Sequence, residues 1–411
     1  MRCMPPLSSL LGPPLALAAA CAHDAPAPPG GLATAFDTID GVVHVTNTGT
    51  PPPAHLVPVV SIGPKTLADT GSPDEFGGVN SVALGPDGEV YVADARNFEV
   101  RVFGLDGAHR RTFGQRGEGP GEFETLSSLA WAGDRLLTYD IMLGRVGQWS
   151  AQGEWLGSWR TRGMITGGGG LVRLYLVGPD ELYRYAMGSS VEGPLGTSTL
   201  QALFLGLNSR GETGDTLVQL EEPPDAPSSF ILCQWGEGFI TGFGVPFAPS
   251  VVQHPGPDGV VYSATTNDYR IAVTRSGGTD TVRVIHRPLP TEPIGDDEWE
   301  EGNREYNEWR AENSGASCEP RAPSRPAAKP ILSGLHIAPD GRLWVEVERT
   351  DGDLWEVFDP DGRLIASVPR TSGMFRAAPA FDASDHLLTV RQDSLGLDHV
   401  DLWRLQWEDS R

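Results

Sequence analysis

Residues Ser81–Phe123 read SVALGPDGEVYVADARNFEVRVFGLDGAHRRTFGQRGEGPGEF. Short apolar runs in this stretch are separated by turns rich in Asp and Gly, such as Pro86-Asp87-Gly88 and Asp106-Gly107. Glycine supplies the positive φ angle that a tight hairpin turn requires. The stretch therefore predicts consecutive antiparallel strands that are joined by tight turns.

The first of these turns recurs along the chain, each time directly before a short apolar run. Its six Asp residues are Asp87, Asp134, Asp180, Asp258, Asp340 and Asp385. Most copies lie about 45 residues apart, which is typical of a four-stranded propeller blade. Two longer intervals contain insertions. The repeat predicts an all-β fold: a six-bladed β-propeller, residues 40–406, with four antiparallel strands in each blade.

The last repeat lacks a candidate for its outer strand, because a second hairpin turn follows only five of the six copies. The apolar run Leu56–Ile62, alone or together with Val42–Val45, is placed to supply that strand. We therefore expect an N-terminal strand to close the ring, which would leave no exposed sheet edge between the first and last blades.

The composition agrees with this fold and excludes several functions. The chain has 411 residues, including 51 Gly and 35 Pro, which favours a turn-rich β protein. Its net charge is −23, with no block of Lys and Arg. Binding to nucleic acid or to an anionic lipid surface needs clustered cations, so neither partner is expected.

Residues 1–21 have the pattern of an export signal. Arg2 precedes an apolar run that Pro13 and Pro14 interrupt, and three alanines lead into Cys21. Small residues before a cysteine resemble a bacterial lipoprotein cleavage box, so we expect lipidation of Cys21 and a periplasmic or outer-membrane lipoprotein. Cleavage at an Ala-x-Ala site without lipidation and an uncleaved N-terminus remain alternatives. Residues 22–39 are expected to form a flexible tether, and the membrane is reached only through the lipid.

Two cysteines remain after such processing, Cys233 and Cys318. In an oxidising compartment they can form a disulfide, while two separate buried thiols are the alternative.

The two long repeat intervals contain the insertions. Residues 187–203 are rich in Gly, Ser and Thr and are expected to form a loop. Residues 288–330 contain one helix candidate, Asp296–Arg310, followed by a Pro-rich loop to residue 330. The aromatic residues on one face of this helix are Trp299, Tyr306 and Trp309. This face is expected either to dock on the propeller or to receive a partner.

The stretch Ser81–Phe123 resembles the NHL repeat, particularly in Val92-Ala93-Asp94, Asn97 and the linker that runs from Gly117 to Phe123. The chain as a whole is similar to bacterial exported six-bladed β-propeller proteins related to NHL proteins. The resemblance implies the fold much more specifically than it implies an activity.

Propellers bind ligands at the ends of a central channel, so polar residues at the ends of inner strands are candidates. Asp94 and Asp140 lie at the ends of second strands, with Arg391 at a corresponding place in another repeat, and these three form the predicted ligand-binding residues at the channel mouth. The alternative for Asp94 is that it fixes its own hairpin loop together with Asn97. No catalytic residue is assigned, because the sequence contains no Gly-x-Ser-x-Gly elbow and no paired histidine motif.

These observations favour a monomeric, non-catalytic binding or scaffold module without a cofactor or metal, whose ligand is a protein, peptide or glycan. The alternative is a metal-dependent lyase or lactone hydrolase with Ca or Zn in the central channel. Such a site needs several His, Asp or Glu ligands from different blades. The nine histidines are isolated in the sequence, so their convergence cannot be judged from it.

Overall fold

The computed structural model describes residues 31–64, 71–161, 173–178, 181–192, 197–207, 213–217, 229–236, 239–275, 280–370 and 377–407. The expected signal, Cys21 and the first part of the tether lie outside these residues, as do the turns at Pro179-Asp180, Arg210-Gly211 and Gly277-Gly278. Among the described residues, no helix is both long enough and apolar enough to cross a membrane.

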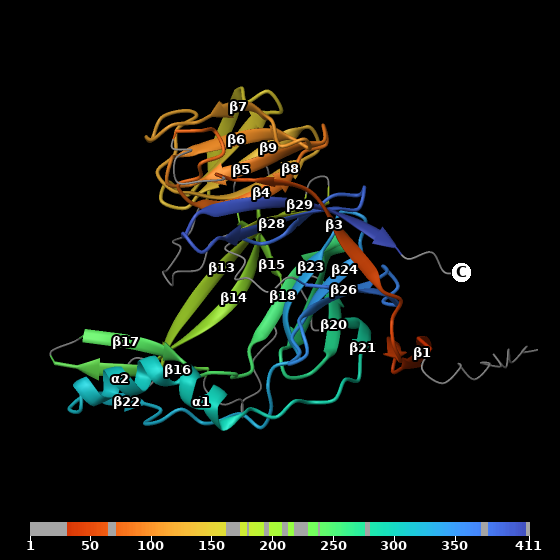
Figure 1. Ribbon diagram of the computed structural model, residues 1–411, viewed down its shortest axis with the longest axis vertical. Coiled ribbons are helices and arrows are strands. Elements are labelled where there is room, and N and C mark those ends of the chain that lie inside the picture. The colour runs from red at the N-terminus through yellow and green to blue at the C-terminus, as the bar shows by residue number, and fades with distance from the viewer. Residues whose placement is uncertain are drawn as a thin grey trace, which may run out of the picture.

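The fold is all-β, and its strands form antiparallel sheets that follow one another along the chain (Figure 1). The first sheet contains β4 Val79–Leu84, β5 Glu89–Asp94, β6 Glu99–Gly104 and β7 His109–Phe113. The second contains β8 Leu126–Ala132, β9 Arg135–Asp140, β10 Arg145–Ser150 and β11 Trp155–Arg160. The third contains β12 Leu174–Gly178, β13 Glu181–Glu192, β14 Thr197–Leu207 and β15 Thr213–Leu217. Each has four strands.

Three further sheets contain the C-terminal repeats. The fourth contains β18 Val251–Gly256, β19 Val260–Thr265, β20 Arg270–Arg275 and β21 Thr281–His286, with a short 3-10 turn at Pro257–Gly259. The fifth contains β23 Leu332–Ile337, β24 Leu343–Val347, β25 Leu354–Phe358 and β26 Leu364–Pro369. The sixth contains β27 Ala380–Phe381, β28 His386–Gln392, β29 Asp398–Trp407 and the N-terminal strand β3 Ala54–Ile62.

The N-terminal strands join sheets that are distant in sequence. β3 pairs antiparallel with β29, so that Val60 lies opposite Leu402. This is the pairing expected for Leu56–Ile62. The expectation for Val42–Val45 is wrong, because β2 Val42–Thr48 pairs in parallel with β21 in the fourth sheet. β1 Ala33–Ile39 pairs with β2, so the expected tether ends before residue 33.

Apolar faces of neighbouring sheets pack against each other to form the core. The first and second sheets share a cluster around Tyr91, Leu126 and Trp149, and the fourth and fifth share one around Ile271 and Val345. The inner strand β4 lies beside both β8 and β27, and β18 lies beside β23. The aromatic residues of the strands mostly fill these interfaces, as Trp344 and Trp355 do beside Phe381.

The first insertion differs from its expectation. Residues 187–203 were expected to form a loop, yet residues 187–192 belong to β13 and residues 197–203 to β14, which pair antiparallel, with Val191 opposite Ser198. Val and Thr are residue types that are enriched in strands. A second hairpin that the sequence did not predict follows, made of β16 Phe230–Trp235 and β17 Phe239–Gly244.

This hairpin and the second insertion form one projecting unit, which we call the arm (Figure 1). The expected helix is present as two helices, α1 Asp296–Gly302 and α2 Arg304–Glu312, separated by Asn303. The expected loop after them contains a short strand, β22 Ser317–Glu319, which pairs with β16.

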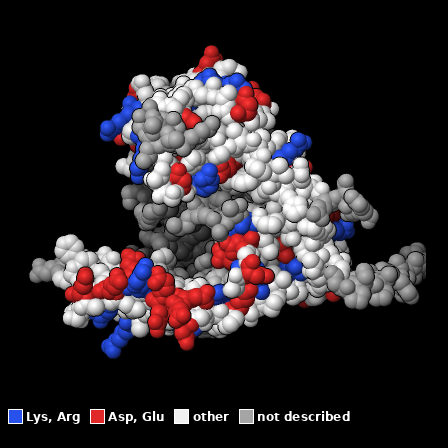
Figure 2. Space-filling view, in the orientation of Figure 1, with Lys and Arg blue, Asp and Glu red and all other residues white. Residues whose placement is uncertain are grey.

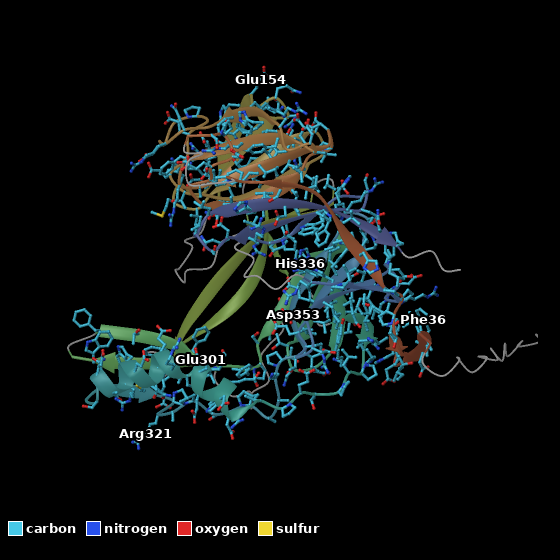
Figure 3. The ribbon with its side chains drawn as sticks, in the orientation of Figure 1. Phe36, Glu154, Glu301, Arg321, His336 and Asp353 are labelled. Atoms are coloured by element: carbon cyan, nitrogen blue, oxygen red, sulfur yellow. A yellow bond between two sulfur atoms is a disulfide. The ribbon has the colours of Figure 1, made fainter. Side chains whose placement is uncertain are left out.

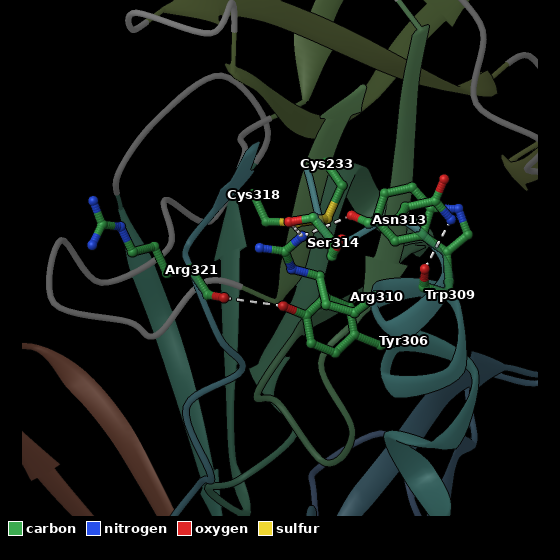
Figure 4. The surroundings of a disulfide bond; sticks show 8 residues. All are labelled: Cys233, Tyr306, Trp309, Arg310, Asn313, Ser314, Cys318 and Arg321. Carbon is green, nitrogen blue, oxygen red and sulfur yellow. Dashed lines mark hydrogen bonds between the residues drawn. A yellow bond between two sulfur atoms is a disulfide. The ribbon is translucent and has the colours of Figure 1, made fainter. Parts of the chain in front are cut away.

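The arm has its own small core. Tyr306 is buried against Phe243, while Trp299 and Trp309 pack at its border. Thus the aromatic helix face docks on the β16–β17 hairpin. The neighbouring Cys233 and Cys318 form a disulfide that joins β16 to β22 (Figure 4).

Candidate functional site

Asp94, the first predicted ligand-binding residue, is fully buried at the end of β5. Its carboxylate accepts hydrogen bonds of 3.1 Å from the backbone N–H groups of Gly77 and Gly78 and one of 2.8 Å from Asn97. The Arg101 guanidinium lies 3.3 Å away. These contacts fix the loop before β4 and the turn after β5. This is the local structural role that was the alternative to ligand binding for Asp94 and Asn97.

Asp140 occupies the equivalent place at the end of β9 and is also buried. It accepts backbone hydrogen bonds from Glu124 at 2.7 Å, Thr125 at 3.0 Å and Leu143 at 2.9 Å. Buried carboxylates that accept several N–H bonds hold a loop in one conformation.

Arg391, the third predicted residue, lies on β28 and is partly exposed. Its Nε donates to Asp401 at 2.6 Å, and a second nitrogen lies 3.3 Å from the Ser61 hydroxyl on β3. No hydrogen bond or ion pair joins Asp94, Asp140 and Arg391 to one another within the described ranges. The structure therefore distributes these three residues over separate local networks.

A different set of polar residues gathers where the inner strands of three sheets meet. We call it the inner cluster; its members are Tyr175 on β12, His254 on β18, His336 on β23, Glu346 on β24 and Arg370 after β26. The His254 ring lies 4.9 Å from the Tyr175 ring and 6.2 Å from the His336 ring, measured between centroids. Residues from three separate repeats are thus brought together at one place.

Glu346 is the centre of the charged part of this cluster. It bonds His336 Nε2 at 2.9 Å and the Ser333 hydroxyl at 3.1 Å, and it pairs with Arg370 at 2.9 Å. Burial by itself would raise the pKa of Glu346, but the bond from His336, together with Arg370, holds it below its ordinary value. Arg370 also reaches Asp353 at 3.2 Å.

His254 has a different electrostatic state. Burial, reinforced by His336 and Arg173, lowers the pKa of His254 to about 3, although its Nδ1 bonds the Pro255 carbonyl at 2.6 Å. The ring is therefore neutral at pH 7, and the Nδ1 carries the proton that is donated to that carbonyl. The inner cluster combines a neutral imidazole, an acid–histidine pair and a cation, which suits hydrogen bonding to a polar ligand.

Glu346→Gln should remove the charged interactions of the cluster without changing its volume. A carboxyl group whose pKa is lower in the folded protein than in the unfolded chain stabilises the folded protein at pH values above its unfolded-state pKa. This contribution is lost as the pH falls through the folded-state pKa. We expect the variant to lose about 1–3 kcal/mol at pH 7 and to show a shallower decline of stability in acid than the wild type. Urea denaturation from pH 3 to 7 measures both effects; an unchanged acid limb would contradict the prediction.

Acidic residues gather on the arm and on the sheets. Figure 2 shows the molecule hollowed between the sheets and the arm, with a band of Asp and Glu along the arm and a second group on the sheets. Figure 3 places His336 and Asp353 on the sheet side and Glu301 on the arm. The exposed acids of α1 and α2 are Asp296, Asp297, Glu298, Glu300, Glu301, Glu305, Glu308 and Glu312.

Some of these acids are paired within the arm. Asp296 pairs with Arg325 at 2.7 Å, and Glu301 pairs with Arg304 at 3.0 Å. In the part of the chain that the structure describes, no group of three or more His, Cys, Asp or Glu side chains could hold a metal ion.

Comparison with known proteins gives one family match. Residues 76–103, from just before β4 to the end of β6, match the NHL repeat. No curated protein matches the sequence. The repeat match and the four-stranded antiparallel sheets support a β-propeller related to NHL-repeat proteins.

Several solved structures are similar at low identity. A protein of Bacteroides fragilis described as exported has 13% identity, covers 92% of this chain and 96% of its own, and has a TM-score of 0.45. Virginiamycin B lyase from Staphylococcus aureus has 9% identity, coverage of 82% and 97%, and a TM-score of 0.38. BamB from Moraxella catarrhalis has 14% identity, coverage of 85% and 99%, and a TM-score of 0.35.

Proposed function

We propose that this chain is an exported, lipid-anchored protein that acts as a non-catalytic binding or scaffold module of the cell envelope. Its six consecutive repeats are the blades of a six-bladed propeller, in which β18–β21 of the six-stranded sheet form the fourth blade, and β3 completes the last blade and closes the ring. Cys21 carries the lipid. The pairing of β3 with β29 and the order of the sheets support this arrangement.

The ligand in this proposal is a protein, peptide or glycan that enters the hollow between the arm and the inner cluster. The observation that carries the proposal is the gathering of His254 on the fourth sheet with His336 and Glu346 on the fifth. Neutral and charged hydrogen-bonding groups at one place, next to an arm with a fixed core, suit recognition of an extended polar ligand.

The test is binding of the mature chain, residues 22–411, to peptide and glycan arrays, followed by calorimetry with the strongest hits. His336→Ala with Glu346→Gln should weaken binding at least tenfold, and Glu305→Gln with Glu308→Gln should test the arm. Glu154→Gln is the control, because Glu154 is exposed at the far end of the second sheet (Figure 3). Equal binding by the site variants and the control would refute this site.

The second candidate is a metal-dependent lyase or lactone hydrolase. It is favoured by the bonded pair of His336 and Glu346, which is suited to proton transfer, although no group of three or more His, Cys, Asp or Glu side chains among the described residues could hold a metal ion. It predicts a stoichiometric metal in the purified protein whose removal by EDTA lowers the melting temperature and abolishes activity in a lactone and lyase substrate screen.

A further inference from the structure

A second group of polar side chains surrounds a cavity at the junction of the N-terminal hairpin with the fourth sheet. The cavity has a volume of about 620 Å³. The polar and charged residues at its wall include Asp37, His44, Asp268 and His286. It lies on the outer strand β21 and therefore belongs to a different part of the fold from the inner cluster.

His44 and His286 meet in this wall with an unusual geometry. His44 Nδ1 lies 3.0 Å from His286 Nε2, and the two ring planes are inclined by only 14°. The ring centroids are 5.3 Å apart, which equals the nitrogen separation plus the radii of both rings. The two nitrogens consequently point at each other in nearly one plane, as in an N–H···N hydrogen bond.

Strand pairing sets this position. In the parallel pair of β2 and β21, His44 lies opposite Val284 and Thr46 lies opposite His286, so both imidazoles share one face. The hairpin is held by Asn47, whose side chain donates to the Gly362 carbonyl at 3.0 Å and accepts from the Leu364 N–H at 2.9 Å. The two histidines are thus brought together by backbone structure rather than by their own contact.

The charges around the pair come from three directions. Asp37 lies opposite His44 on β1, Arg270 lies opposite His286 on β20, and Asp268 lies in the turn before β20. Arg287 also lines the cavity, but its charge is paired with Glu356 at 3.0 Å. Positive and negative charges therefore both lie near the pair.

Neutral imidazole is the commonest protein ligand of transition metals. A tetrahedral zinc ion bound at 2.0–2.1 Å holds two histidine nitrogens roughly 3.3 Å apart. The observed 3.0 Å is close to this separation, but the two nitrogens point at each other, so each half-buried ring must turn by roughly 35° for both lone pairs to meet at one ion beside the cavity. When the metal is bound, the ring that donated the N–H···N hydrogen bond carries its proton on its other nitrogen.

We propose that His44 and His286 form a two-histidine site for a divalent transition-metal ion, Zn²⁺ or Cu²⁺, whose remaining coordination positions face the cavity and are filled by water. Asp37 and Asp268 contribute negative charge near the ion, in opposition to Arg270. The site is independent of the inner cluster and goes beyond the proposed binding function. It places the metal where β2 of the N-terminal hairpin pairs with β21 of the fourth sheet.

The experiment is a Cu²⁺ titration of the metal-free mature chain, followed by electron paramagnetic resonance. One equivalent of Cu²⁺ should give the splitting pattern of two coordinated nitrogens, and Zn²⁺ bound beforehand should raise the amount of Cu²⁺ needed to produce it, because Cu²⁺ binds the same ligands more tightly than Zn²⁺. His44→Gln and His286→Gln each retain a hydrogen-bonding side chain, so the hairpin should stay docked. Each should lower the affinity at least tenfold and reduce the pattern to one nitrogen.

Two controls separate this site from other histidines. His109→Gln changes an exposed histidine on β7 that bonds Thr112, and His336→Gln changes the inner cluster. Both should leave the spectrum unchanged. The proposal is overturned if the wild type shows fewer than two nitrogens, if both site variants keep the wild-type spectrum, or if His336→Gln alone removes it. If one site variant fails to fold, the other site variant, compared with the two controls, decides whether the nitrogens come from this pair.

Discussion

Arg287→Met should destabilise the protein by about 3–5 kcal/mol at neutral pH, which is the usual cost of leaving one member of a buried ion pair alone. Arg287 Nε donates to both carboxylate oxygens of Glu356, at 3.0 and 3.1 Å, and a second guanidinium nitrogen lies 3.0 Å from the same carboxylate. Both side chains are buried between the fourth and fifth sheets. The variant leaves the Glu356 charge with no cation beside it.

The loss should depend on pH in a defined direction. Burial raises the pKa of Glu356 above its ordinary value, and Arg287 acts against this rise. Without Arg287, the folded-state pKa should rise further. A carboxyl group whose pKa is raised in the folded state is most compatible with that state at pH values below its unfolded-state pKa, where it is protonated. The stability of the folded state then falls as the pH rises and the group ionises. Urea denaturation should therefore show a smaller difference from the wild type at pH 5 than at pH 7.5.

Two further variants make this prediction specific. Arg287→Met combined with Glu356→Leu removes both charges and should recover most of the lost stability. Arg275→Met removes the exposed partner of Asp280, 3.2 Å away, and should cost less than about 1 kcal/mol. If the double variant were as unstable as Arg287→Met, lost packing rather than an unpaired charge would be the cause.

Replacing Cys233 and Cys318 together with Ser should lower the stability of the arm by about 4 kcal/mol, as expected from the entropy of closing a long loop. The two cysteines are separated by 85 positions in sequence. Both are buried in the small core that contains Tyr306 and Phe243. With so little apolar surface of its own, this core depends strongly on the covalent link.

The measurement is thermal unfolding followed by near-ultraviolet circular dichroism, which reports the aromatic residues of the arm. Reductant should lower the melting temperature of the wild type and leave that of the double variant unchanged. Limited proteolysis should then cut the variant first within residues 289–330. A wild-type melt that does not respond to reductant would show that the disulfide contributes little to the arm.

The parts of the fold that were predictable depend on local chemistry. The turns at Asp87-Gly88 and Asp106-Gly107 predicted hairpins because Gly88 and Gly107 have the positive φ angles that such turns need. The count of turns identified a missing outer strand, and Leu56–Ile62 pairs with β29. The helix of the second insertion was visible in the spacing of its aromatic residues, although Asn303 divides it in two.

The differences arise where the partner of a segment is distant in sequence. Val42–Val45 is as apolar and β-branched as Leu56–Ile62, so the sequence does not distinguish which sheet edge each joins. The Gly and Ser residues of 187–203 indicated a loop, but pairing between two such segments makes a hairpin. The sequence between β16 and β17 lacks the Asp-Gly pair found at Asp87-Gly88 and Asp106-Gly107.

The residues of the candidate site could likewise be predicted only where their partners are close in sequence. Asp94 and Asp140 were found because each lies next to the loop that it fixes. His254 and His336 looked isolated, since the strands that carry them come from different repeats. Their meeting with Glu346 depends on how whole sheets pack, which no local pattern encodes.

The pairing of β3 with β29 also constrains how the molecule is made. A chain that emerges from the ribosome N-terminus first exposes β3 long before its partner exists. During that interval this apolar segment has an unpaired edge and needs protection from association with other chains. The sixth sheet can therefore be completed only after β29 has been synthesised.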